Sequence, residues 1–272
     1  MAELAGPSVL RQYTVLLRLG FAAARQYRAD FVMTAIGALC YEAVSLAFAG
    51  VVVHAFGSIG GWGFREVAFV YGIRSMGHAL HGLGFGQLWS TDGVVRRGEF
   101  DRYLLRPISP LLQLMTRQFQ VTAVGDLVFA TILLVITGAA APVSWTAISA
   151  LYLLAVVIGS GLVEAAVMLA IASLTFRLLV TTPLMRVADS VYVTFGPYPL
   201  NIMPRAVSYL LTFLLPLALT AYFPAAILLG RSGGLFVPVW FAGCSPLFGV
   251  ILFVAAVLFF RQQSRHYSSP GH

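Results

Sequence analysis

Six ionisable side chains fall inside long apolar stretches of this sequence, where an isolated charge is costly. They are Glu42, Arg74, His78, His81, Asp126 and Glu164. Such groups are rare within membranes, where they pair with one another or face a water-filled cavity. The sequence therefore predicts either a lined pathway or a structural polar network. One pairing is geometrically allowed, because Glu42 and Arg74 lie at similar depths in neighbouring apolar segments.

The acids among these six groups also suggest a ligand. Carboxylates and aromatic faces both attract cations, and aromatic residues make up 13% of the chain. An amphipathic or cationic lipophile would suit a cavity built from them. The alternative is that the acids pair with Arg74 and the two histidines and serve the fold alone.

The same residues do not form a recognisable catalytic centre. His78 and His81 are spaced for one helix face, but two imidazoles fall short of a zinc site, and a hydrogen-bonded polar face is the simpler interpretation. Ser160 lies between two glycines, a pattern typical of helix packing. The sequence contains no lysine, so it lacks the phosphate-binding loop that requires one. We expect no metal, no cofactor and no enzymatic activity on this chain.

Composition indicates an all-α polytopic membrane protein with a single domain over residues 1–272. Hydrophobic residues make up 59% of the chain and the mean hydropathy is +0.87, which excludes a soluble core. At ~20 residues per span, there is room for six spans and their loops but for no nucleotide-binding domain as well. The expected spans cover residues 31–53, 67–88, 119–141, 148–174, 179–195 and 235–260.

An amphipathic segment, residues 8–28, precedes the first span. Arg11, Arg18 and Arg25 are spaced by seven and lie near one another on a helix, beside an apolar stripe. We expect this helix to lie in the membrane interface, with its arginines reaching lipid phosphates.

Residues 90–118, STDGVVRRGEFDRYLLRPISPLLQLMTRQ, form a charged island between two apolar segments. Its charges are concentrated at Arg96, Arg97, Glu99, Asp101, Arg102 and Arg106. Phe100, Tyr103 and Leu104 recur at helical spacing and would share one face, and the proline after Arg106 should end the helix. The pattern predicts a short amphipathic helix over residues 94–105 that docks in a groove of another protein. A solvated loop of positive-inside arginines is the alternative.

In two places the sequence resembles the ABC-2 type permeases, the membrane subunits of ATP-driven exporters. They are RRGEFDRYLLRPISPLLQL in the charged island and FGPYPLNIMPRAVSYLLTFLLPLALTAYFPAAILLG at residues 195–230. The resemblance implies that helix 94–105, between spans two and three, is a coupling helix that seats in an ATPase subunit. The residues in contact with the ATPase would be Arg96, Arg97, Glu99, Phe100, Asp101, Arg102, Tyr103 and Leu104.

The second match bears on the fifth span. Hydropathy alone would choose residues 206–229, whereas the resemblance implies that span five is residues 179–195. Residues 197–230 would then form re-entrant external helices, which a membrane tolerates where protein or a cavity covers them. Their breaks would fall at Pro197, Pro199, Pro204, Pro216 and Pro224.

The resemblance also implies partners. Two ABC ATPase subunits would bind ATP and magnesium, and a second permease subunit, identical or homologous, would complete the pathway in contact with membrane lipid. The six-span branch suggests drug-like or viologen-like organic cations as cargo. The arginines gather on one side of the expected spans, which predicts a multi-pass protein of the bacterial inner (plasma) membrane with both termini in the cytoplasm. We do not read this charge as a nucleic-acid site.

A proton-coupled secondary transporter is the competing function. Glu42, Asp126 and Glu164 would relay protons, and the two histidines would tune them. It would require an internal repeat that the two halves do not clearly show, and it leaves the amphipathic island without a role. A non-transporting membrane scaffold would explain the island but not the proline-broken region.

Overall fold

The computed structural model describes residues 9–268, so Ser8, the first residue of the expected interfacial helix, lies outside it. The longer helices are α1 (Val9–Ala24), α2 (Arg28–Phe56), α3 (Phe64–Phe85), α7 (Thr122–Ala140), α8 (Ala147–Ser173), α10 (Thr182–Phe195) and α14 (Ser245–Ser264). The shorter ones are η1 (Gly86–Ser90), α4 (Thr91–Arg96), α5 (Phe100–Leu104), α6 (Pro110–Met115), α9 (Thr175–Leu178), η2 (Leu200–Ile202), α11 (Arg205–Phe213), η3 (Leu217–Leu219), α12 (Tyr222–Leu228), η4 (Ser232–Gly234) and α13 (Val239–Gly243). No β-strand occurs in this described part.

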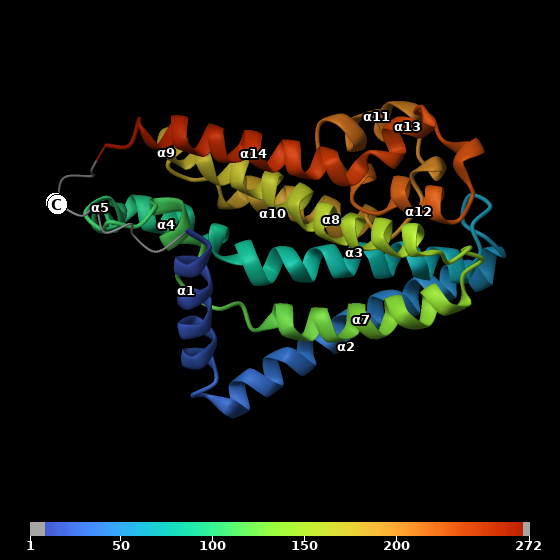
Figure 1. Ribbon diagram of the computed structural model, residues 1–272, viewed down its shortest axis with the longest axis horizontal. Helices are drawn as coiled ribbons and strands as arrows, with labels where there is room; N and C mark the ends of the chain where they lie inside the picture. Colours follow the sequence, from blue (N-terminus) through green and yellow to red (C-terminus); the bar gives the residue numbers. More distant parts are fainter. Residues whose placement is uncertain (1–8, 269–272) are drawn as a thin grey trace.

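The long helices run beside one another, and the short ones gather at the two ends (Figure 1). In the described residues, four helices are long and apolar enough to cross a membrane, namely α2, α7, α8 with its continuation α9, and α14. The bent pair formed by α11 and the segment Leu217–Leu228 would make a fifth. The chain is therefore an all-α membrane protein that crosses the bilayer several times.

Two further helices belong to the same bundle. Helix α3 packs against α7 and α8, and its glycines and histidines lower its hydropathy. Helix α10 has 14 residues and is therefore about 21 Å long, less than the ~30 Å hydrocarbon core. It begins at Thr182, later than the expected start of span five, because Leu179 adopts a left-handed conformation with φ 58°.

Helix α1 lies across one end of the bundle (Figure 1). Tyr13 donates a hydrogen bond to the Gly84 carbonyl at 3.1 Å, and the Phe21 ring packs edge-on against Phe119 with centroids 5.1 Å apart. These contacts attach α1 to the ends of α3 and α7. Its three arginines, Arg11, Arg18 and Arg25, have exposed side chains.

The charged island forms two short helices where the sequence predicts one over residues 94–105. Gly98 has φ 67° and ends α4 with two hydrogen bonds, from the Gly98 amide to the Val95 carbonyl and from the Glu99 amide to the Val94 carbonyl. This is the Schellman arrangement, which needs a residue that tolerates the left-handed region. Helix α5 then contains Phe100, Tyr103 and Leu104, the three residues expected to share one face, while the residues before Gly98 belong to α4.

The structure contradicts the expectation that Phe100 presents its ring to a partner. Its side chain is 0% exposed, and its ring centroid lies 5.0 Å from those of both Phe176 and Tyr267. Tyr103 is half-buried beside it. Leu104 and Leu105, at 54% and 86% exposed, carry the outward apolar surface instead.

The proline-rich region gathers at the opposite end of the bundle (Figure 1). The axis of α11 and that of Leu217–Leu228 differ by 76° across the break that contains Pro216. Pro199, Pro204 and Pro216 each immediately precede a helical segment, and Pro224 lies in the first turn of α12, where its missing N–H costs nothing. The prolines thus divide this region into short pieces.

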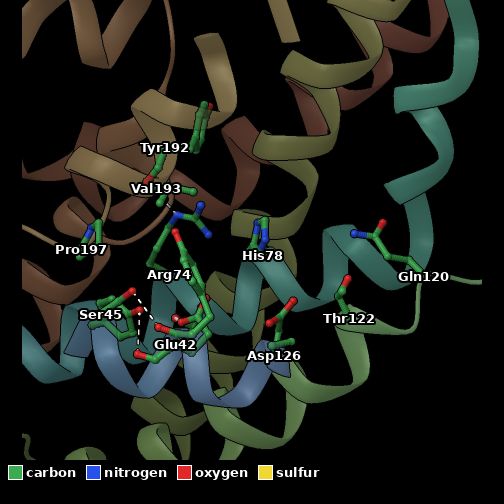
Figure 2. A pocket seen from close by; sticks show the side chains of 14 residues that line it. Glu42, Ser45, Arg74, His78, Gln120, Thr122, Asp126, Tyr192, Val193 and Pro197 are labelled. Carbon is green, nitrogen blue, oxygen red and sulfur yellow. Dashed lines mark hydrogen bonds between the residues drawn. The ribbon is translucent and has the colours of Figure 1, made fainter. Parts of the chain in front are cut away.

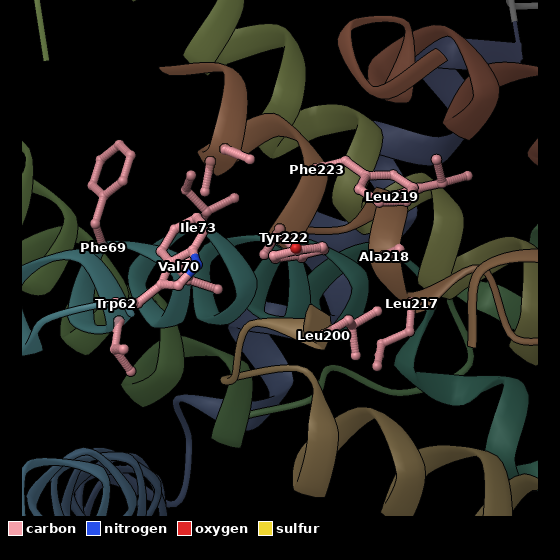
Figure 3. Close-up of a cluster of buried hydrophobic side chains, with 14 of the residues drawn as sticks. Trp62, Phe69, Val70, Ile73, Leu200, Leu217, Ala218, Leu219, Tyr222 and Phe223 are labelled. Atoms are coloured by element: carbon pink, nitrogen blue, oxygen red, sulfur yellow. The ribbon is translucent and has the colours of Figure 1, made fainter. Parts of the chain in front are cut away.

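A hydrophobic core holds those pieces on α3. Trp62, Phe69, Val70 and Ile73 pack with a set of residues from the proline-rich region (Figure 3). The set comprises Leu200, Leu217, Ala218, Leu219, Tyr222 and Phe223. Helix α12 is covered by protein, the condition under which broken helices are stable at membrane depth.

The buried Phe100 ring leads to a first prediction. Phe100→Ala should destabilise the folded protein by about 3–5 kcal/mol, because it leaves a cavity among three aromatic rings. Leu105→Ala, which removes an exposed side chain, should leave stability nearly unchanged. The free energies of unfolding of both variants in detergent micelles check this, and equal values would contradict the packing described.

Candidate functional site

A cavity of about 330 Å³ lies between α2, α3, α7 and α10. Four of the six ionisable groups singled out in the sequence line it, namely Glu42, Arg74, His78 and Asp126 (Figure 2). The other lining residues are Ala38, Tyr41, Ser45, Tyr71, Ser75, Gln120, Thr122, Tyr192, Val193 and Pro197. The structure therefore brings together residues that are far apart in the sequence.

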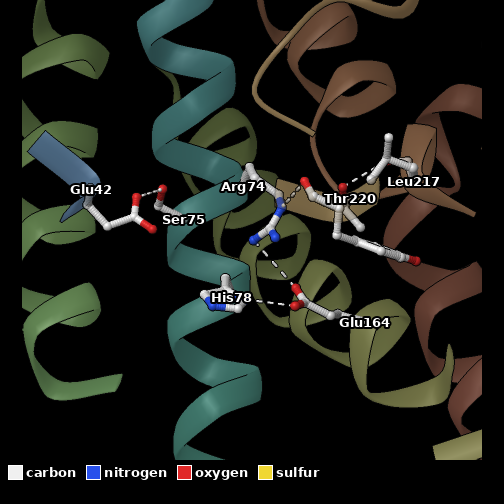
Figure 4. Close-up of polar contacts among 8 residues, drawn as sticks. Glu42, Arg74, Ser75, His78, Glu164, Leu217 and Thr220 are labelled. Atoms are coloured by element: carbon white, nitrogen blue, oxygen red, sulfur yellow. Dashed lines mark hydrogen bonds and ion pairs between the residues drawn. The ribbon is translucent and has the colours of Figure 1, made fainter. Parts of the chain in front are cut away.

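Glu164 reaches from α8 to two side chains of α3, His78 and Arg74 (Figure 4). His78 Nδ1 lies 2.6 Å from Glu164 Oε1, and Arg74 Nη1 lies 3.5 Å from Glu164 Oε2. The Glu164 side chain is 1% exposed and that of Arg74 is 5% exposed. Two buried charges are tolerated when each has the other as its partner. The pairing between Arg74 and Glu42 that the sequence allows does not form.

Arg74 also contacts α10. Its Nε donates to the Tyr192 carbonyl at 3.4 Å, and its guanidinium lies 5.8 Å from the centre of the Tyr192 ring. A Cβ at Gly196 would lie 2.8 Å from Arg74 Nε, so the close approach requires glycine there. Arg74 consequently joins three helices, α3, α8 and α10.

Helices α3 and α8 approach closely enough for this contact because small residues face each other. A Cβ on Gly77 would collide with the Ser160 side chain, and one on Gly161 would lie 3.0 Å from the Gly77 carbonyl oxygen. Ser160 Oγ is buried without a hydrogen-bond partner in the described residues. Ser160 therefore lies in a helix contact, as the packing interpretation of its glycine neighbours expects.

The other two acids of the cavity differ from Glu164. Ser75 Oγ donates to Glu42 Oε2 at 2.8 Å, while the Tyr71 hydroxyl donates to the Glu42 backbone carbonyl at 3.3 Å. Asp126 is 9% exposed and makes no hydrogen bond or ion pair with any residue that the structure describes. It is a carboxylate that faces the cavity without a partner.

His81 lies apart from the cavity lining. Its ring is 3% exposed and stacks on Phe85, with centroids 6.3 Å apart. Its Nδ1 has no partner among the described residues, and Glu164 is the carboxylate that pairs with His78 instead. The two histidines therefore share a helix face without acting together on one acid.

Two carboxylates in the cavity lining are not paired with an arginine. Glu164 balances the charge of Arg74, which leaves Glu42 and Asp126 without a matching guanidinium. Tyr41 and Tyr71 also line the cavity, whereas the Tyr192 ring is fully buried against Arg74. Carboxylates and aromatic faces are the groups that hold organic cations, so the cavity is suited to bind one.

Helical spacing could have revealed part of this lining. Tyr71, Ser75 and His78 follow at intervals of four and three residues, so they share the face of α3 that carries Arg74. No comparable signal marks Tyr192 or Gln120, because each enters the site from a segment distant in sequence.

The residues expected to contact an ATPase lie at the end of the bundle that carries α1. Arg96, Arg97, Arg102 and Leu104 are exposed, whereas Glu99 and Asp101 are partly buried. Glu99 accepts hydrogen bonds from Arg97 Nε at 2.7 Å and from Arg117 Nη2 at 2.9 Å. The bond from Arg97 holds the pKa of Glu99 below its ordinary value, so its carboxylate is ionised at neutral pH.

Comparison with known proteins gives one match. The model of a family described as ABC-2 family transporter protein matches residues 39–271, which include every lining residue of the cavity except Ala38. No curated protein and no solved structure matches the chain.

The charge group around Glu164 yields a second prediction. Glu164→Gln leaves Arg74 buried without its counter-charge and should destabilise the protein by about 3–5 kcal/mol. Asp126→Asn is the matched control, since it neutralises a buried acid that has no partner, and stability should hold or rise. Unfolding free energies measured in bicelles check both. A larger loss of unfolding free energy in Asp126→Asn than in Glu164→Gln would contradict the pairing of Glu164 with Arg74.

Proposed function

Since the chain belongs to the ABC-2 family of transporter proteins, we propose that it is the membrane-spanning permease subunit of an ATP-driven exporter. The family implies a partner ABC ATPase. The absence of lysine supports this division of labour, because no phosphate-binding loop of the lysine-containing type can be built from this sequence. ATP and magnesium would bind to two copies of the partner ATPase, and this chain would hold no cofactor.

The topology we propose has six spans, formed by α2, α3, α7, α8, α10 and α14, with α11 to α13 as re-entrant helices on the outer side. The arginines support its orientation. Helices α4 and α5, which contain Arg96 and Arg102, lie at the same end as α1, and Arg117 pairs with Glu99 between them (Figure 1). Arg231 pairs instead with Glu66 in the first turn of α3, beside the proline-rich region. By the positive-inside rule both termini face the cytoplasm, here of a bacterial inner membrane.

We place the ATPase contact on the outward surface of α4, α5 and the turn that follows. The exposed side chains Leu104 and Leu105 supply an apolar centre. Exposed arginines surround it, namely Arg96, Arg97, Arg102 and Arg106. An apolar centre with a polar rim is the usual anatomy of a protein interface. This pair of water-facing leucines among arginines is the observation that carries the proposal of a docked partner.

Transport would follow from mechanical coupling between that surface and the cavity. Closure of the ATPases on ATP would push on α4 and α5 and shift the bundle between two packed states. Two permease subunits, identical or similar, would enclose the pathway. The cargo we propose is a lipophilic or amphipathic molecule of the cationic, drug-like kind, held by Asp126, Glu42 and the tyrosine rings.

The docking surface is tested by charge reversal. Arg97→Glu with Arg102→Glu should lower recovery of the permease–ATPase complex, and its ATPase rate in lipid, by about tenfold or more, because interface arginines are frequent hot spots. Leu104→Ser with Leu105→Ser should have a similar effect. Arg261→Glu with Arg265→Glu, a reversal of two exposed arginines in the last turn of α14 and at its C-cap, is the matched control. Unchanged recovery of the permease–ATPase complex in the first two variants would contradict the docking proposal.

The cargo is tested at the unpaired acid. Asp126→Asn should reduce transport of a quaternary ammonium lipophile by roughly tenfold, since each lost charge contact in a low-dielectric site is worth ~1–2 kcal/mol. Transport of a neutral lipophile and the assembly of the complex should not change. Asp30→Asn, at an exposed acid on α2, is the control. Equal loss for both cargoes would argue against a cation-selective cavity.

A proton-coupled secondary transporter remains the second candidate, favoured by the same unpaired Asp126. Proteoliposomes that contain the permease alone separate the two functions. Uptake driven by a pH gradient without the ATPase would establish secondary transport, and an absolute requirement for ATPase and ATP would exclude it.

A further inference from the structure

A hydrogen-bonded contact links the charged island to α10. Asp92 Oδ2 in α4 accepts from the Thr182 hydroxyl at 2.6 Å and from the Thr182 backbone amide at 3.4 Å. The two residues are 90 positions apart in the chain, and Asp92 is 6% exposed.

Asp92 therefore acts as a cap for a helix to which it does not belong. Thr181, which precedes α10, makes no capping bond of its own, because its hydroxyl pairs with that of Thr175 at 2.6 Å. The Asp92 carboxylate supplies the missing acceptor at the positive end of the helix dipole. Burial raises the pKa of Asp92, but the hydrogen bonds from Thr182 and from the Gly93 amide, together with the charge of Arg96, outweigh it, so the pKa lies below its ordinary value and the group is ionised at neutral pH.

Helix α10 is suited to move as one body. Its buried residues, Met185, Ala188 and Tyr192, form a single stripe, while Leu184 and Val187 on other faces are 47% and 60% exposed. One end is held by Asp92, and the Tyr192 carbonyl near the other end is held by Arg74. A helix attached by one stripe and two end contacts transmits a displacement of its first turn along its length.

The far half of the same helix forms a wall of the cavity. Tyr192 and Val193 line it opposite Glu42 and Asp126 (Figure 2). A shift of α4 that pulls Thr182 would thus change the shape of the cavity directly, without first deforming α3.

We propose that Asp92 and Thr182 form the mechanical link by which movement of α4 against the ATPase is passed to α10 and the cavity wall. The inference rests on the proposed exporter function, and both residues are positioning residues that touch neither nucleotide nor cargo.

The first experiment separates ATP hydrolysis from transport in the permease–ATPase complex in lipid. Thr182→Val removes the donor hydroxyl with little change of shape and should lower transport about tenfold, while complex recovery and ATPase rate stay near wild type. Thr182→Ser restores the hydroxyl and should restore transport. Thr137→Val is the matched control, because the buried Thr137 hydroxyl donates to Leu133 within its own helix at 2.7 Å.

Asp92→Ala should reproduce the uncoupling, and the double variant Asp92→Ala with Thr182→Val should be no worse than either single change, since both remove one contact. Wild-type transport by Thr182→Val would overturn the inference. So would a parallel loss of assembly, ATPase activity and transport in that variant, which would assign the contact to folding or docking.

A second measurement uses the permease alone in nanodiscs. Backbone amides of residues 184–188 should exchange hydrogen about tenfold faster in Thr182→Val and Asp92→Ala than in wild type, and Thr137→Val should match wild type. Unchanged exchange would show that Asp92 does not hold α10 and would overturn the link. If these amides respond but the wild-type permease binds no ATPase, the exporter function fails and the proposed role of the link fails with it.

Discussion

The buried charge group of Glu164, Arg74 and His78 constrains the rest of this structure. Because Glu164 and Arg74 are almost fully buried, each must keep its partner, so α3 and α8 cannot slide past each other without leaving a buried charge unpaired. The close crossing at Gly77 and Ser160 brings the charges within reach. Because Arg74 is neutralised by Glu164, the negative charge of the cavity comes from the acids on α2 and α7.

Separate contacts hold the two ends of the bundle together. At the end that carries the proline-rich region, Arg231 donates to Glu66 at 2.6 Å and to the Gly61 carbonyl at 3.0 Å, which attaches that region to the start of α3. The aromatic core of that region strengthens the attachment. At the other end, the short helices pack around Phe100 and Phe176. Helix α10 connects these two ends along its single buried stripe.

The sequence predicts the helices and their breaks better than it predicts which distant residues touch. Apolar length indicates the helices, and the prolines indicate a broken region, because both effects are local. The partner of Arg74 is not local: Glu42 and Glu164 both lie at compatible depths, and the choice depends on which helices cross. The expectation that Phe100 faces a partner misses for the same reason, because the rings that cover it belong to the distant residues Phe176 and Tyr267. Gly98, by contrast, is a recognisable helix stop that the expected 94–105 helix overlooks.

The length of α10 explains why a cavity exists beside it. At 14 residues, between the left-handed Leu179 and the pair Gly196-Pro197, the helix is too short to cross the hydrocarbon core alone. It cannot pack along the full height of α3 and α8, so space remains next to its far end, and polar groups from α2 and α7 face that space. A longer α10 would occupy the space beside its C-terminal end and would hold that wall of the cavity in one position. The cavity and the proposed movement of α10 thus depend on the same short helix.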